Sequence, residues 1–131
     1  MSQLVVEYRK IGLLPTCIGN ERIRVAGSRV SYARNTRECE PDERWSDEWR
    51  IIGELTADAA AALAAEIRDS GLLRSRPESI DDTAEGGKRE EISLTIDDVT
   101  YEFVVQNTEH AEFRRAVRAL YGAIEQARMI S

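Results

Sequence analysis

Ile92-Ser-Leu-Thr-Ile-Asp-Asp-Val-Thr-Tyr-Glu-Phe-Val-Val105 is the stretch that decides the fold class of this chain. Apolar and polar residues alternate on both sides of Asp97-Asp98, and a period of two is typical of strands with one buried face. If the two aspartates form the turn, each apolar residue of the first strand faces one of the second: Ile96 opposite Val99, Leu94 opposite Tyr101, and Ile92 opposite Phe103. The stretch therefore predicts an antiparallel hairpin.

The same reasoning predicts a second hairpin around Gly27-Ser28. A two-residue loop there places four apolar side chains on one face by pairing Val25 with Val30 and Ile23 with Tyr32. Glycine in the first loop position fits a type II′ turn. Alternation alone predicts two further strands: one over about residues 3–9, with Leu4, Val6 and Tyr8, and another with Trp49, Ile51, Gly53 and Leu55.

Two amphipathic helices complete the pattern. Thr56 is a typical N-cap, because its hydroxyl can accept a hydrogen bond from the first turn, and this helix is expected to end near Ser70. The second helix is expected to start near Thr108. Its apolar face would contain Phe113, Val117, Leu120, Tyr121 and Ile124.

The order ββββ-α-ββ-α predicts an α+β fold, an antiparallel sheet with both helices packed on one face. With 131 residues, of which 42% are hydrophobic, the chain has the size and composition of one globular domain, residues 1–131. Two charged segments, near 36–48 and 74–90, are expected to be loops because neither carries a periodic apolar pattern.

Charge and apolar runs narrow the class of partner. The formal net charge of −6 has the wrong sign for neutralising phosphates, so nucleic acid is not expected as a partner. The chain has no signal-like start and no membrane-length apolar run, which favours a cytoplasmic protein with no membrane partner. Its two cysteines, Cys17 and Cys39, are then expected to be reduced, and a disulfide bond between them is the alternative.

Few residues suit catalysis or metal binding. His110 is the only histidine and is expected on the surface, so a thiol enzyme would have to combine it with Cys17 or Cys39. Two cysteines 22 positions apart, without a second histidine, do not make a tetrahedral zinc site. The sequence therefore predicts no catalytic residue, no metal and no cofactor.

Two features suggest an interaction surface. The connection Ile11–Ile18 is unusually apolar, with Leu13, Leu14 and Pro15 at its centre, and exposed apolar clusters often mark partner sites. The alternative is that these side chains fold over the end of the core, which is the commoner arrangement. Trp45 lies in an acidic stretch with Glu43 and Asp47, where it could anchor a basic partner or pack onto the sheet beside Trp49.

From about Leu55 to Ile124 the chain resembles emfourin-type proteins, small bacterial inhibitors of thermolysin-like metalloproteases. The resemblance lies in Leu55-Thr-Ala-Asp58 before an Ala/Leu helix, Gly71-Leu-Leu73, a charged gap, the hairpin 92–105 and a final helix. It implies an inhibitor with a protein partner, and assigns no inhibitory residue in this chain.

The leading hypothesis is a non-enzymatic protein-binding module of inhibitor-like or immunity type. Its candidate binding residues are Leu13, Leu14, Pro15, Trp45, Glu43 and Asp47. Two alternatives remain. One is a small-ligand binding protein or thiol-dependent enzyme, and the other is a structural homo-oligomer joined through an edge strand or the first loop.

Overall fold

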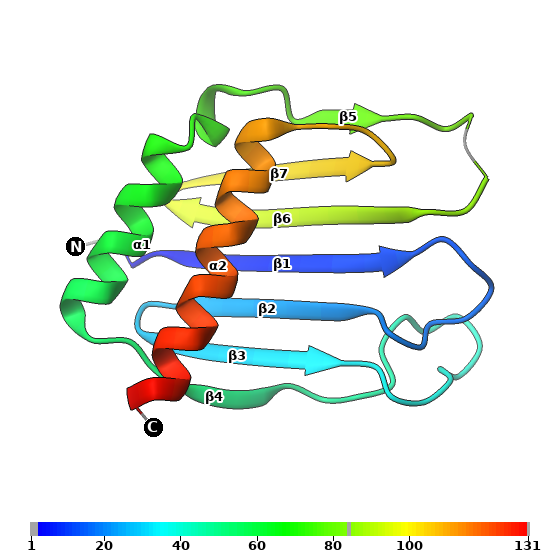
Figure 1. Ribbon diagram of the computed structural model, residues 1–131, viewed down its shortest axis with the longest axis horizontal. Coiled ribbons are helices and arrows are strands. Elements are labelled where there is room, and N and C mark those ends of the chain that lie inside the picture. The colour runs from blue at the N-terminus through cyan, green and yellow to red at the C-terminus, as the bar shows by residue number, and fades with distance from the viewer. Residues whose placement is uncertain (1–2, 84, 131) are drawn as a thin grey trace.

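A single sheet carries two helices on one of its faces in the computed structural model, which describes residues 3–83 and 85–130 (Figure 1). The elements in chain order are β1 (Val5–Gly12), β2 (Glu21–Ala26), β3 (Arg29–Arg34), β4 (Arg50–Glu54), α1 (Ala57–Asp69), the 3₁₀ turn η1 (Leu72–Arg74), β5 (Glu78–Ile80), β6 (Lys88–Ile96), β7 (Val99–Gln106) and α2 (Ala111–Ile130). The predicted α+β class is confirmed.

The spatial order of the strands is β4-β3-β2-β1-β6-β7-β5, with every neighbouring pair antiparallel except β5 and β7. Both hairpins have the predicted register, Val25 opposite Val30 and Leu94 opposite Tyr101. Asp97 and Asp98 both have positive φ, 53° and 65°, as a type I′ turn requires.

The core lies between the sheet and the helices. Alternate side chains of the five central strands point to this inner face, among them Val6, Ile23 and Leu94, and they contact buried residues of the helices such as Ile67 and Phe113. Helix α2 crosses the sheet from β7 toward β4, and α1 packs beside it near the hairpin turns (Figure 1). Among the described residues, no helix is long and apolar enough to cross a bilayer.

Segment 74–90 is not a featureless loop. Residues 78–80 form β5, which pairs in parallel with β7, and β6 begins at Lys88. Alternation could not reveal β5, because Glu78 and Ile80 are exposed and the strand is held mainly by its backbone pairing.

Two local predictions are wrong. Helix α2 starts at Ala111, because His110 Nδ1 accepts the Phe113 N–H at 3.2 Å, whereas the Thr108 hydroxyl donates to Ser79 O at 2.8 Å. In β4 the expected inward residue Ile51 is 62% exposed. The register shifts between Val30 and Ser31, and the neighbouring Ile52 packs against the core.

The two ends of the sheet differ. One end holds the tight hairpin turns at 27–28 and 97–98, and we call the opposite end the loop end (Figure 1). The connections 13–20, 35–49 and 107–110 gather at the loop end together with residues 81–83 and 85–87, so this end contains most of the irregular chain that the structure describes.

Candidate functional site

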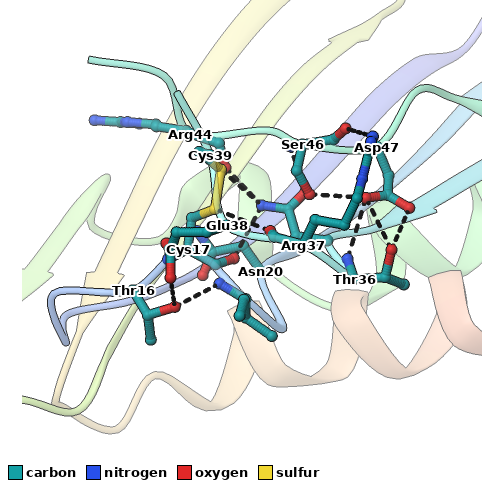
Figure 2. The surroundings of a disulfide bond; sticks show 12 residues. Thr16, Cys17, Asn20, Thr36, Arg37, Glu38, Cys39, Arg44, Ser46 and Asp47 are labelled. Carbon is teal, nitrogen blue, oxygen red and sulfur yellow. Dashed lines mark hydrogen bonds between the residues drawn. A yellow bond between two sulfur atoms is a disulfide. The ribbon is translucent and has the colours of Figure 1, made fainter. Parts of the chain in front are cut away.

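A disulfide joins two connections of the loop end. Cys17 in segment 13–20 is bonded to Cys39 in segment 35–49, with 6.1 Å between their Cα atoms and 22 positions between them in the sequence (Figure 2). The expectation of reduced cysteines is wrong for this structure. Neither sulfur is a free thiol here, so the thiol-enzyme alternative has no nucleophile in this state.

Polar side chains reinforce the cross-link. The Glu38 carboxylate accepts hydrogen bonds from the Cys17 N–H at 3.0 Å and from the Thr16 hydroxyl at 2.7 Å, and these bonds lower the pKa of Glu38. Asn35 is buried and links both connections, since its Nδ2 donates to Cys17 O and Arg44 O. The two segments are therefore tied by side-chain and covalent contacts, with Asn35 at their base.

Asp47 has a structural role in the same segment. Its carboxylate accepts hydrogen bonds from the Ser46 hydroxyl at 2.7 Å and from the backbone N–H and hydroxyl of Thr36 (Figure 2). These bonds lower the pKa of Asp47. Because its oxygens already face donors of its own segment, Asp47 is a poor candidate for the partner contact that the sequence suggested.

Trp45 packs onto the sheet. The Arg22 guanidinium lies 4.7 Å from the centroid of the Trp45 ring and 4.3 Å from that of the Trp49 ring. Arg22 alternates with the inward residues of β2, so this stack covers the outer face of the sheet, away from the helices. Of the two readings of Trp45, the structure shows the packed one. Glu43 is exposed.

The apolar residues of segment 13–20 do not close the core. Leu13, Leu14, Pro15 and Ile18 are all exposed, Leu14 at 64% and Ile18 at 54%. We call these four residues the apolar tip. The sequence offered either an exposed cluster or a cover for the core, and the structure shows the cluster.

The backbone beneath the apolar tip is anchored on three sides. The Leu13 N–H donates to Gly87 O at 3.0 Å, and the Gly12 N–H donates to Asn20 Oδ1 at 2.9 Å. The disulfide at Cys17 is the third anchor. Gly87 is itself fixed, because Asn107 bonds the backbone on both sides of it and occupies the space that a Cβ would need.

Two buried glutamates lie under α2, and the sequence analysis missed both. Glu90 is 2% exposed and receives the Tyr8 hydroxyl at 2.6 Å and two bonds from the Arg114 guanidinium, at 3.0 and 2.6 Å. Glu21 receives the hydroxyls of Tyr32 and Tyr121 and the Lys10 ammonium. Their burial could have been predicted from the sequence, because Glu21 and Glu90 continue the inward alternation of β2 and β6.

Both carboxylates remain charged in spite of their burial. Desolvation raises the pKa of Glu90, but the bonds from Arg114 and Tyr8 outweigh it and the net pKa is lowered. The pKa of Glu21 is lowered by the same balance, with Lys10 and Tyr121 as the main donors. Burial raises the pKa of Tyr32 to about 12. These networks fasten α2 to the sheet and leave no group poised for proton transfer near neutral pH.

A cleft of about 860 Å³ opens beside Glu90. Its charged lining comprises Lys88, Glu90, Glu109 and Arg114, so its charges cancel. His110 also lines it, but its side chain is only 1% exposed, and its Nε2 lies 3.0 Å from Arg76 O while Nδ1 serves as the N-cap. The expected surface histidine is thus buried and structural. In residues 3–83 and 85–130, no group of three or more His, Cys, Asp or Glu is placed to hold a metal ion.

Comparison with known proteins adds no assignment. No family model matches the chain. The search of curated proteins also finds no match. The resemblance to emfourin-type inhibitors therefore stays a prediction. The loop end is the candidate site because of its geometry alone.

Proposed function

We propose that this chain is a non-enzymatic protein-binding module, and that the apolar tip is the centre of its contact surface. The observation that carries the proposal is the combination of four exposed apolar residues with a backbone anchored by Gly87, Asn20 and the Cys17–Cys39 bridge. Exposed apolar side chains gain free energy when a partner covers them. A backbone already fixed in one conformation loses little entropy on binding.

The charge around the apolar tip indicates the chemistry of the partner. Segment 35–49 is cross-linked to the tip, and four of its exposed carboxylates make no side-chain hydrogen bond or ion pair with the part of the chain that the structure describes: Glu40, Asp42, Glu43 and Glu48. We call these four residues the acidic rim. A complementary surface would have an apolar pocket bordered by Lys or Arg side chains. The emfourin-type resemblance supports a protease as one such partner.

The acidic rim and the apolar tip contribute differently to binding. Rim charges act mainly on the association rate and lose their effect in salt, whereas buried apolar anchors set the dissociation rate. Alanine at all four rim positions should slow association by about tenfold at low salt and change dissociation little. An association rate that is unchanged in this variant at low salt would remove the acidic rim from the proposal.

The first test is affinity capture from a lysate of the source organism with three proteins. These are the wild type, the tip variant Leu14→Ser/Ile18→Ser, and a control, Ile51→Ser/Val99→Ser, which removes exposed apolar residues elsewhere on the surface. We expect one protein to be enriched by the wild type and the control and lost by the tip variant, since removal of interface anchors typically weakens binding by about tenfold or more each. Equal capture by the tip variant and the control would contradict the proposal.

A further inference from the structure

We infer that the Cys17–Cys39 bridge is a redox switch whose reduction releases segment 36–49 and so dismantles the contact surface. The effect on binding rests on the function proposed above, whereas the release of the segment does not. The first observation is burial. Every residue from 36 to 49 is exposed or half-buried, so no side chain of the segment is enclosed in the core.

The non-covalent contacts of the segment are few, and most are exposed to solvent. Glu38, Arg37 and Asp47 make their hydrogen bonds at the exposed surface. Such bonds contribute little to stability, because water competes for both partners. The stack of Trp45 and Trp49 on Arg22 is the one substantial packing contact, and it lies after Cys39 in the chain. Residues 36–44 therefore depend most on the bridge and on Asn35.

The cross-link acts on chain entropy. It closes a loop between positions 17 and 39, and a link across a loop of this size removes many open conformations of the segment. Without it, the exposed contacts alone must offset the conformational freedom of about a dozen surface residues. Reduction removes the restriction that the cross-link imposes and so shifts the balance toward the open segment.

The reduction requires a dithiol reductant. One of its thiolates attacks a sulfur of the bridge to give a mixed disulfide, and its second thiolate then releases that sulfur. The protein gains two thiols, the reductant becomes a disulfide, and two electrons and two protons pass to the protein. Cys17 and Cys39 are both half-buried at the loop end, so a small dithiol can reach them.

The bridge is also continuous with the contact surface. Cys17 lies between Pro15 and Ile18 of the apolar tip, and Cys39 lies beside Glu40 of the acidic rim. Opening the bond therefore separates the tip from the rim and removes one of the three anchors of the tip. The oxidised form presents both parts in one arrangement, and the reduced form does not.

Limited trypsin digestion tests the release without any partner. Arg44 lies in the segment and is exposed, and Arg74 in η1 lies outside it and serves as an internal reference. We expect cleavage after Arg44 to be about tenfold faster or more in protein reduced with dithiothreitol, and in Cys17→Ser/Cys39→Ser, than in oxidised protein. Cleavage after Arg74 should change little, and circular dichroism should show the sheet and helices intact.

Equal cleavage after Arg44 in the oxidised and reduced forms would overturn the inference. So would rapid cleavage in the reduced form with undiminished capture of the partner, which would leave the proposed binding function standing. If the oxidised wild type captures no partner, the proposed function fails, and with it the switch as a control of binding. Release together with at least tenfold weaker capture after reduction is the result that supports both.

Discussion

Several side chains in this protein have structural roles that the neighbouring sequence does not reveal. Asp47 and Trp45 look like surface residues of an acidic stretch, yet one accepts bonds from Thr36 and Ser46 and the other stacks on Arg22. The Thr36–Asp47 and Arg22–Trp45 contacts join residues 11 and 23 positions apart, so no local pattern reveals them. Glu90 is different, because the alternation of β6 predicts that its side chain points inward. Only its partner on α2, Arg114, could not be predicted from the local sequence.

The Glu90–Arg114 pair predicts an unequal response of two arginines on α2. Arg114→Met leaves a buried carboxylate without its main partner and should lower the free energy of unfolding by about 3 kcal/mol. Arg118→Met removes an exposed charge of the same helix and should change it by less than about 0.5 kcal/mol. Urea unfolding measures both, and a similar loss in the two variants would show that Arg114 does not neutralise Glu90.

The lowered pKa values of Glu21 and Glu90 predict acid sensitivity. A carboxyl with a lower pKa in the folded than in the unfolded state adds stability above its unfolded pKa, near 4.5, and loses it as pH falls through the folded value. Stability should therefore be level between about pH 7 and 5.5 and decline below about pH 4.5. The decline should be shallower in Glu90→Gln. Denaturant titrations at several pH values would refute this if that variant kept the full acid-dependent loss.

At the scale of elements, the hairpins were the most predictable part of the fold. Their register follows from two-residue turns with apolar residues on a single face, which is local information. The start of α2 and strand β5 were not predictable in this way. The first depends on the fold burying His110, and the second on a backbone edge that β7 happens to expose.

The turn of the second hairpin is a site where stability can be gained. Asp98 has φ of 65°, a conformation that glycine adopts without strain. Asp98→Gly should raise the free energy of unfolding by about 0.5–1 kcal/mol, while Asp98→Val should lower it, because a β-branched residue resists positive φ. Asp97 is left unchanged, since it pairs with Arg68. Thermal melts of the two variants that shift in the same direction would show that the turn is not as described.

For the whole molecule, one helical layer and one sheet explain why the order of elements sufficed to predict the architecture. The arrangement of the loop end did not follow from that order, because the disulfide, Asn35 and Asn107 join segments that only the finished sheet brings together. The sequence identified Leu13, Leu14 and Pro15, and left their exposure open. Charge predicted an acidic surface, but not which carboxylates remain free of internal bonds.

The edges of the sheet bear on the homo-oligomer alternative. Strand β4 is short and its pairing is irregular beside Val30, and β5 at the other edge spans only residues 78–80. Short or irregular edges are poor templates for strand addition. Light scattering of the oxidised protein should therefore give the mass of one chain at micromolar concentration. A stable dimer would instead indicate that the apolar tip or an edge strand contacts a second copy of the chain.

Hydrogen exchange of the chain alone and bound to the captured partner tests the central claim most directly, because it locates the contact on the folded protein. The account predicts slower exchange of the amides in segments 13–20 and 35–49, and little change in α1, α2 and the turns at 27–28 and 97–98. Protection confined to the helices or to the edge strand β4, with the loop end unchanged, would contradict it.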